Sequence, residues 1–335
     1  MPEHGSAAWF QQDVEIDVSG TCAVEGRLTV AATVHLPPAD ALADGATVIF
    51  ALPGGGYSRG YFDMHFAGHD RYSQAEHHVA RGLVFVAVDH LGVGASTPEV
   101  CGDLRAEDIA SANHAAMVGI ADLLERGAIA PAYPPLRVLR RVGVGQSMGG
   151  AITILMAARH RSYDAVAVLG FSAIHTVLPF AEHAESEAVA GRVGGERRDA
   201  HPGTQSVAAV AARIPDFLYP FFWSDVPEDV VAADTAGGYP LRTEAPVFGS
   251  ATLPSCAVAM LSSGYVAEDA ALIDVPVFIG VGVRDVTQTP LREPAAYERA
   301  TDVTVFVVPR MAHMHNFAST RSMLWERLAA WVDCL

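Results

Sequence analysis

Residues 136–161 read LRVLRRVGVGQSMGGAITILMAARHR, and this stretch decides the fold. Its centre, Gly145-Gln146-Ser147-Met148-Gly149, matches the pattern G-x-S-x-G. The Val-rich residues 136–144 predict a strand before the motif, and the apolar residues 148–161 predict a helix after it. The glycines permit a sharp turn that leaves the Ser147 hydroxyl exposed above a sheet, at the positive end of a helix dipole. The pentapeptide alone is a weak signal, but this context makes Ser147 the candidate nucleophile.

The rest of the chain alternates predicted strands with predicted helices. The run Leu83-Val84-Phe85-Val86-Ala87-Val88 is continuously apolar, which is typical of a strand buried on both faces of a parallel sheet. The alternation predicts an α/β fold, with a mostly parallel sheet of about eight strands covered by helices on both faces. Further strands are expected over residues 14–18, 28–35, 47–52, 165–170, 275–281 and 303–308, and further helices over residues 71–81, 106–126, 290–300 and 317–332.

The alternation stops between residues 172 and 271. This segment opens with the charged residues 182–199 and continues with the aromatic run Phe217-Leu218-Tyr219-Pro220-Phe221-Phe222-Trp223. A structureless loop of this length is implausible inside a compact domain, so we expect an inserted helical subdomain, or cap, over residues 172–271. Residues 1–171 and 272–335 then form the α/β core.

A serine hydroxyl becomes a good nucleophile when a base accepts its proton, and a carboxylate commonly orients that base. The acid candidate is Asp285, which follows the strand predicted over residues 275–281. Loops at the carboxyl ends of parallel strands face the crevice where ligands bind. Asp274 precedes the same strand and should lie at the opposite edge of the sheet. Asp285 could instead serve only as a turn residue.

Two histidines follow the last predicted strand, in the segment Met311-Ala312-His313-Met314-His315. His313 lies nearer the strand end, in the kind of loop where the base is expected, and we assign it as the general base. His315 abuts the final predicted helix, where it could cap the helix or bond to the backbone, and it stays the alternative base. The other histidines have no comparable placement and are expected to be surface or packing residues, although one of them could border the pocket.

The tetrahedral intermediate of acyl transfer needs N–H donors for its oxyanion. One donor is expected from the backbone of Met148, directly after the nucleophile. The second is expected from the loop Pro53-Gly54-Gly55-Gly56-Tyr57, because three consecutive glycines follow an apolar strand there. We assign Gly55 as this donor, with Gly56 and Tyr57 as the next candidates, and we expect Gly56 and Tyr57 to lie close to the substrate. A merely flexible turn is the alternative for this loop.

Composition argues against several other classes. The chain has 22 Lys and Arg against 38 Asp and Glu, a formal net charge of −16, and it has no basic run. Such a chain repels phosphate backbones, so nucleic-acid and membrane partners are not expected. The cysteines show no C-x-x-C spacing, so they are expected to be free thiols and not zinc ligands. They are Cys22, Cys101, Cys256 and Cys334.

The first ten residues lack the pattern of a secretory signal, and no apolar stretch of about 18 residues occurs. We therefore expect a cytoplasmic protein that acts on a small-molecule substrate. Neither a metal nor an organic cofactor is expected, and homo-oligomers stay open.

These features together resemble those of the α/β-hydrolase superfamily, in its cap-bearing serine esterase and lipase-like branch. The resemblance covers nearly the whole chain outside the insert. It rests on Gly-Gln-Ser-Met-Gly around Ser147, Gly-Val-Arg-Asp ending at Asp285, and Met-Ala-His ending at His313. The segment from Asp89 to Ser96 is also similar to the family's glycine-rich loop after the fourth strand, which is usually structural. The resemblance implies a Ser-Asp-His triad in this chain order.

Two departures from the family pattern stand out. Family members often carry His-Gly before the oxyanion glycines, where this chain has Pro53-Gly54, so the loop is expected to be held differently. The usual glycine before the triad histidine is Ala312 here.

The residue at the nucleophile position narrows the range of reactions that the resemblance implies. Dehalogenases and epoxide hydrolases of this fold resemble one another in having Asp at this position, in the turn called the nucleophile elbow. A serine there implies acyl transfer to water.

The expected reaction is hydrolysis of an ester, lactone or thioester of a small hydrophobic substrate through an acyl-enzyme. Phe222 and Trp223 are expected to line an apolar pocket under the cap, although such aromatics could also pack the cap's own core. The alternatives are hydrolysis of an amide or C–C bond, acyl transfer to another acceptor, and a non-catalytic small-molecule receptor on this fold.

Overall fold

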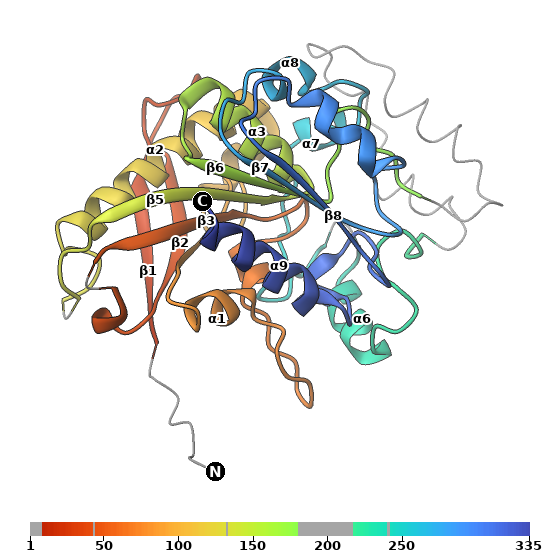
Figure 1. The fold of residues 1–335 in the computed structure, drawn as a ribbon, viewed down its shortest axis with the longest axis horizontal. Helices are drawn as coiled ribbons and strands as arrows, with labels where there is room; N and C mark the ends of the chain where they lie inside the picture. Colours follow the sequence, from red (N-terminus) through yellow and green to blue (C-terminus); the bar gives the residue numbers. More distant parts are fainter. Residues whose placement is uncertain (1–8, 43, 132, 180–216, 240–241) are drawn as a thin grey trace.

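The computed structural model describes residues 9–42, 44–131, 133–179, 217–239 and 242–335. Within these ranges the chain forms one eight-stranded sheet in the order β1-β2-β4-β3-β5-β6-β7-β8 (Figure 1). β2 pairs antiparallel with β1 and β4, and all other neighbours are parallel. The strands are β1 (Phe10–Asp17), β2 (Thr29–Leu36), β3 (Ala46–Leu52), β4 (Val84–Val88), β5 (Val138–Gln146), β6 (Ala165–Leu169), β7 (Val277–Gly282) and β8 (Val303–Val308).

Helices cover both faces of the sheet, as predicted. The described α-helices are α1 (Gln74–Val79), α2 (Ala106–Glu125), α3 (Met148–His160), α6 (Glu228–Thr235), α7 (Cys256–Ala259), α8 (Ala267–Ala270) and α9 (Arg321–Asp333). Short 3-10 helices complete the chain, namely η1 (Ala39–Leu42), η2 (Arg59–Phe62), η3 (Pro98–Asp103), η4 (Pro290–Ala296) and η5 (His315–Phe317). None of the helices in the described ranges is long and apolar enough to cross a membrane.

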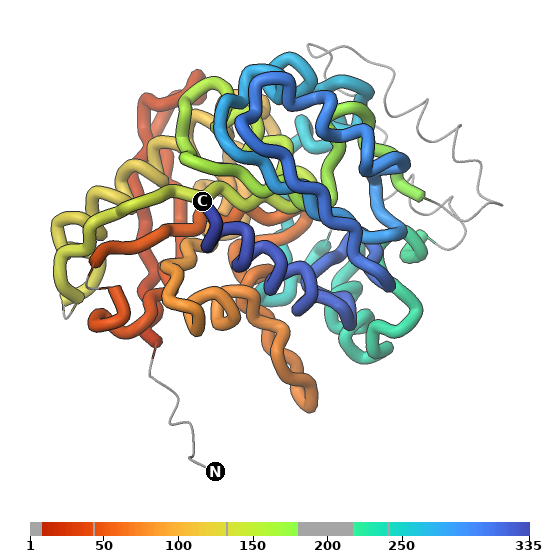
Figure 2. The backbone as a smooth tube through the Cα atoms, viewed as in Figure 1, coloured from red at the N-terminus to blue at the C-terminus, as the bar shows by residue number. Residues whose placement is uncertain are grey.

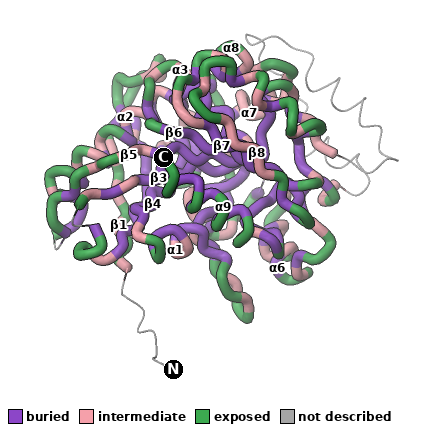
Figure 3. Tube along the Cα trace, in the orientation of Figure 1, coloured by how far each residue is buried: buried purple, intermediate pink, exposed green. Residues whose placement is uncertain are grey.

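Alternate residues of the central strands belong to two hydrophobic cores, one on each face of the sheet. In β3, Val48, Phe50 and Leu52 pack with α2 and α3, whereas Ile49 and Ala51 pack on the opposite face with α1 and α9. This follows from the two-residue period of a strand, which sends successive side chains to opposite faces. Figure 3 shows the central strands as buried, and every residue of β4, β6 and β7 is buried. The continuous apolar runs therefore predicted doubly buried strands correctly.

Two predicted helices differ from the structure. The helix expected over residues 290–300 is the 3-10 helix η4, which begins at Pro290 and contains Pro294. Proline lacks a backbone N–H and clashes with the preceding turn, so a regular α-helix does not form there. The helix expected over residues 317–332 is preceded by η5 and begins later, at Arg321.

The structure describes residues 172–179, 217–239 and 242–271 of the insert. The charged segment at residues 182–199 lies outside the described residues. The described part carries the short helices α6, α7 and α8. Its boundaries as a separate cap over residues 172–271 stay a prediction.

Strand pairing brings the loops of interest to one edge of the sheet. The strands from β3 to β8 run parallel, so the loops that follow them emerge on the same side. Leu52 at the end of β3 pairs with Gly145 of β5, and Gln146 of β5 pairs with Leu169 of β6. The glycine loop after β3 therefore lies beside the turn that carries Ser147.

The turn between β5 and α3 has almost no room for side chains. A Cβ added to Gly149 would lie 2.1 Å from the carbonyl oxygen of Leu52, and one added to Gly145 would lie 2.1 Å from the carbonyl oxygen of Gly149. Real Cβ atoms do not approach backbone this closely. Ser147 itself has φ 54° and ψ −118°, a backbone conformation that is strained for a residue with a side chain. The glycines of the motif are therefore required by backbone-to-backbone packing.

We predict that Gly149→Ala destabilises the protein, because its methyl group must displace the end of β3. The expected loss is roughly 1–3 kcal/mol, as for other overpacked sites. Thermal unfolding followed by circular dichroism measures it. Gly102→Ala is the matched control, because a Cβ at Gly102 meets nothing within 4 Å. An equal effect of the two substitutions would contradict this account of the turn.

Candidate active site

Ser147 lies at the first turn of α3, where the strained backbone presents its hydroxyl to the loop after β8. His313 Nε2 lies 2.9 Å from Ser147 Oγ, and His313 Nδ1 lies 2.8 Å from Asp285 Oδ1. The histidine and the carboxylate are buried, and Ser147 is half-buried. The structure thus brings together Ser147, His313 and Asp285 in hydrogen-bond contact. With Nδ1 protonated toward Asp285, Nε2 is free to accept the serine proton.

Asp285 accepts four hydrogen bonds, two at each carboxylate oxygen. The backbone N–H of Val286 and the His313 ring donate to Oδ1, and the backbone N–H of Gly282 and the His315 ring donate to Oδ2. Burial alone raises the pKa of Asp285, but the charge of His315 and the hydrogen bonds from both imidazoles hold the pKa well below its usual range. The carboxylate stays ionised and fixed in orientation.

His315, the alternative base, is placed differently from His313. Its Nε2 lies 2.6 Å from Asp285 Oδ2, so this nitrogen faces the acid and not the serine. Gly170 lies against both rings, since a Cβ there would be 3.2 Å from His315 Nε2 and 3.3 Å from His313 Nδ1. The arrangement favours His313 as the base and makes His315 a second donor to Asp285. From the sequence we expected His315 to cap the helix or bond to the backbone, or to be the base, and its contact with Asp285 was missed.

The glycine loop after β3 lies directly against Ser147. A Cβ on Gly54 would lie 3.2 Å from Ser147 Cβ, and one on Gly55 would lie 4.0 Å from Met148 Sδ. Among the described residues, the backbone N–H groups of Gly55 and Met148 have no hydrogen-bond acceptor. Both groups are thus available to a ligand, in keeping with their predicted role as oxyanion donors.

The loop is held by its carbonyl groups. His90 Nε2 donates to the Pro53 carbonyl at 2.9 Å, and Asn113 Nδ2 donates to His90 Nδ1 at 2.9 Å. Burial lowers the pKa of His90 to about 4, so this ring is neutral near neutral pH. From the sequence we expected His90 to be a surface or packing residue, or one that borders the pocket, and its role as a support for this loop was missed. In this chain, the segment Pro53-Gly54 is therefore held at the Pro53 carbonyl by His90.

Gly56 and Tyr57 form hydrogen bonds with residues of the insert. The Gly56 carbonyl accepts a hydrogen bond from Arg242, and the Tyr57 hydroxyl donates to Asp234 Oδ2 at 2.6 Å. Neither side chain of the buried Asp234–Arg242 ion pair was singled out from the sequence. Asp234 and Arg242 lie far from the glycine loop along the chain, so no local sequence motif indicates that they contact it.

The aromatic run of the insert packs against the loop that carries His313. The backbone N–H groups of His313 and Met314 donate to the carbonyls of Pro220 and Phe221 at 3.0 and 2.9 Å. Figure 2 shows these segments side by side, the insert in teal and the loop after β8 in dark blue. The ring of Phe221 lies 6.0 Å from that of His313. Phe221 is therefore the aromatic residue of the run that reaches the site.

The two aromatic residues named from the sequence face other neighbours. Phe222 is buried and packs edge-to-face on Phe317 at 5.6 Å. The half-buried Trp223 lies against the guanidinium of Arg284, at 4.6 Å from the ring centre. Phe317 and Arg284 lie outside residues 172–271, so these two contacts are not those of a core belonging to the cap alone, and a role of the two aromatics in substrate binding stays a prediction.

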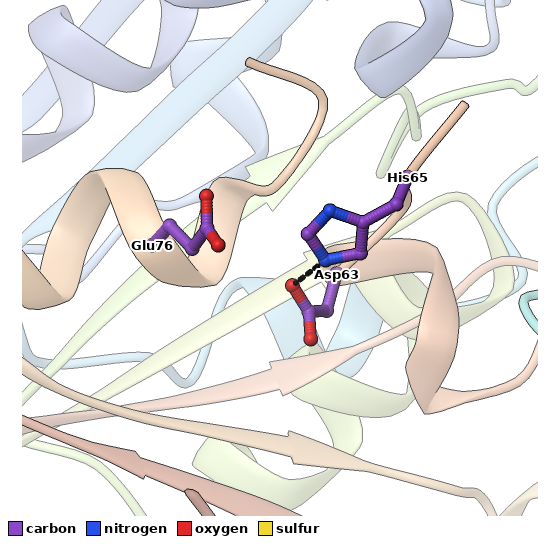
Figure 4. Close-up of side chains that lie close together, drawn as sticks. All are labelled: Asp63, His65 and Glu76. Atoms are coloured by element: carbon purple, nitrogen blue, oxygen red, sulfur yellow. Dashed lines mark hydrogen bonds and ion pairs between the residues drawn. The ribbon is translucent and has the colours of Figure 1, made fainter. Parts of the chain in front are cut away.

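One group of side chains in the described part of the chain has the spacing of metal ligands. Asp63, His65 and Glu76 can bring ligand atoms within 4.8 Å of one another (Figure 4). Asp63 Oδ1 already accepts hydrogen bonds from His65 at 3.0 Å and from Ser73 at 2.6 Å. His65 is exposed, and the others are half-buried. Exposed groups of this kind are common on acidic proteins, and we assign no metal to it.

The comparisons with known proteins identify the fold. No family model and no curated protein sequence matches the chain. A peroxisomal α/β-hydrolase from Saccharomyces cerevisiae is similar in structure, with a TM-score of 0.56 and 14% identity over 97% of this chain and 88% of that one. A thermophilic esterase from Thermogutta terrifontis gives 0.58 and 16%, over 96% and 98% of the two chains. A haloalkane dehalogenase loop variant from Bradyrhizobium elkanii gives 0.59 and 16%, over 97% of each chain.

The chain therefore has the α/β-hydrolase fold, as its resemblance to that superfamily predicted. The neighbours differ in chemistry, and a shared fold does not select among reactions. The fold therefore does not define which reaction the site supports.

We predict that the stabilising effect of Asp285 depends on pH. Its pKa is depressed in the folded protein, so its contribution is complete above the unfolded value of about 3.9 and is lost as the pH falls below that value. The difference in free energy of unfolding between wild type and Asp285→Asn should therefore be constant at neutral pH and shrink below about pH 4. Urea unfolding at a series of pH values measures it.

Asp274→Asn serves as the control, because Asp274 is half-exposed and pairs at the surface with Arg161. Its effect should be small throughout. A difference for Asp285→Asn that stays the same from pH 7 to pH 3 would contradict the described environment of the carboxylate.

Proposed function

We propose that the protein is a serine hydrolase that cleaves a carboxylic ester, lactone or thioester of a small hydrophobic substrate. The observation that carries this proposal is the contact chain from Ser147 Oγ through His313 to Asp285, with distances of 2.9 and 2.8 Å. Three groups of these types in this order are suited to activate a serine. The fold alone supports no more than a hydrolase-like scaffold.

In the proposed mechanism, Ser147 Oγ attacks the substrate carbonyl carbon while His313 Nε2 takes the hydroxyl proton. Asp285 holds the imidazole in the required tautomer and stabilises its protonated form. His313 then gives the proton to the leaving oxygen or sulfur, which departs and leaves an acyl group on Ser147. A water molecule, deprotonated by His313, attacks the acyl carbon, and collapse of the second tetrahedral intermediate releases the acid and restores the serine.

Oxyanion stabilisation is assigned to the N–H groups of Gly55 and Met148. Both groups lie beside Ser147 and have no acceptor among the described residues. Met148 is the first residue of α3, where backbone N–H groups have no partner within the helix and the helix dipole favours negative charge. Such donors usually supply a large share of the rate enhancement.

The nucleophile separates this chain from the dehalogenase-like members of its fold. Those members resemble one another in using Asp at the elbow, whereas the elbow residue here is Ser147. A serine forms an acyl ester with carbonyl substrates, which is the reaction of esterases. Two apolar side chains lie near the site, with Phe221 beside His313 and Leu253 beside Gly55. We infer that they favour uncharged, hydrophobic acyl or alcohol groups.

We also propose a role for the insert and a partner for the site. Residues 172–271 would act as a cap over the site, with Phe222 and Trp223 available to substrates that reach beyond Phe221. The proposed partner is the small-molecule substrate, and the proposed mechanism uses no metal or organic cofactor.

We predict that a fluorophosphonate reacts covalently with Ser147. Ser147→Ala should abolish the adduct, and His313→Ala should slow labelling by roughly 10⁴-fold, because the serine loses its base. His315→Ala should slow it by only about tenfold, the value of one hydrogen bond to a charged group. Peptide mass spectrometry locates the adduct, and His65→Ala, at an exposed position, is the control. Labelling that survives His313→Ala but not His315→Ala would assign the base to His315.

We also predict a hydrophobic preference among p-nitrophenyl esters. The value of kcat/KM should rise roughly fourfold for each added CH₂, at about 0.8 kcal/mol per buried group, until the pocket is filled. Acetate, butyrate, hexanoate and octanoate esters measure this, with the succinate half-ester as the charged control. A succinate half-ester that is turned over as well as the butyrate would contradict the proposed substrate class. No turnover of any ester, with Ser147 still labelled, would favour an amide or C–C bond substrate.

A further inference from the structure

We propose that Arg242, held by Asp234, is a positioning residue for the oxyanion hole, and that it acts on Gly55 through two intervening peptide groups. The inference rests on the proposed function, since it concerns the donor assigned above. It adds a residue from the insert to the machinery of the site.

Arg242 and Asp234 form an ion pair that is fully buried. Both side chains are 0% exposed, and Arg242 Nη2 lies 2.7 Å from Asp234 Oδ1. All three guanidinium nitrogens have acceptors, because Nε and Nη2 donate to the Asp234 carbonyl and Nη1 donates to the Gly56 carbonyl. Burying two charges is costly, and replacing a buried pair with apolar residues often leaves stability unchanged. Stability alone therefore does not explain the pair.

The acceptors of Arg242 connect it to the glycine loop. The Gly56 carbonyl receives the Nη1 bond and a second bond from the backbone N–H of Ser250 at 2.9 Å. The Gly56 carbonyl and the Tyr57 N–H belong to the same peptide group. The Tyr57 N–H donates in turn to the Gly54 carbonyl at 3.2 Å. That carbonyl shares its peptide group with the Gly55 N–H, which has no acceptor among the described residues.

The result is a hydrogen-bonded chain that runs from the Arg242 cation to the Gly55 N–H. Hydrogen bonds in such chains polarise one another, by roughly 10–30% per bond. A positive charge at one end withdraws electron density along both peptides and makes the Gly55 N–H a stronger donor. The chain also fixes the direction of this N–H, because rotating the Gly54–Gly55 peptide would break the bond from Tyr57.

Further contacts tie the insert to the same loop. The Tyr57 hydroxyl donates to Asp234 Oδ2 at 2.6 Å, and the backbone N–H of Ser58 donates to the Phe248 carbonyl at 3.0 Å. Asp234 belongs to α6 and precedes Arg242 in the chain. The oxyanion donor is therefore set only when this part of the insert is docked on the core.

The test compares Arg242→Gln with the wild type on p-nitrophenyl butyrate and on a trifluoromethyl ketone of the same chain length. The ketone forms a hemiketal with Ser147 whose oxyanion occupies the hole, so its Ki reports on the hole. We expect kcat to fall roughly 10- to 100-fold, somewhat less than for loss of a donor itself. KM should change little, and Ki should rise by the same factor by which kcat/KM falls. Arg242→Lys should recover part of the loss.

Arg310→Gln is the matched control, because Arg310 also pairs with an insert residue, Asp225 at 3.2 Å, but at an exposed position. It should leave kcat, KM and Ki unchanged. If circular dichroism shows that Arg242→Gln does not fold, Asp234→Asn carries the test, since it keeps the shape of the site while weakening the hold on the guanidinium. The same pattern is expected there, with a smaller loss.

The inference is overturned if a folded Arg242→Gln or Asp234→Asn keeps the wild-type kcat and Ki. It is equally overturned if KM rises while kcat is unchanged, because that result marks a role in packing or substrate binding only. Failure of the proposed function would look different, since the wild type itself would then give neither an adduct at Ser147 nor ester turnover.

Discussion

The contact of Gly149 with the end of β3 is the constraint on which the rest of the site depends. With no side chain at Gly149, α3 approaches the Leu52 carbonyl closely enough that the nucleophile turn and the glycine loop share one surface. The strained backbone of Ser147 is tolerated because the strand before it and the helix after it are buried, and their packing fixes the backbone conformation between them. Backbone packing thus positions Ser147 and the N–H groups that are proposed as oxyanion donors.

Two buried carboxylates organise the polar groups around this surface. Asp285, just after the end of β7, accepts hydrogen bonds from two imidazoles and two backbone N–H groups. Asp234, whose pKa burial raises to about 6 against the opposing effects of Arg242 and Tyr57, orients a guanidinium behind the glycine loop. A buried carboxylate is tolerated only where donors satisfy it. In the proposed account, one of these carboxylates orients the base and the other supports the oxyanion hole.

Much of the fold and part of the site could be predicted from the sequence. Continuous apolar runs identify strands such as β4 and β7 because burial on both faces leaves no polar positions. Asp285 and His313 could be proposed because parallel strands deliver the loops after them to one edge. His313 and His315 lie two residues apart in one loop, and spacing does not show which ring meets Ser147. The Asp234–Arg242 pair was missed because its partner loop, at Gly56 and Tyr57, is remote in sequence and burial of a charge has no local pattern. The helix expected at residues 290–300 failed for a local reason, the proline inside it.

The central claim is that acyl transfer passes through Ser147, and pre-steady-state kinetics with p-nitrophenyl acetate test it most directly. The account predicts a burst of p-nitrophenol of about one equivalent per active site, and acid quenching in the burst should trap an acetyl group on the peptide that contains Ser147. The burst arises when deacylation is slower than acylation, as the account predicts for this activated ester, and acid quenching then traps the acetyl ester. Steady turnover with no acetyl group on Ser147 at any time, or with the acetyl group on another residue, would contradict the account.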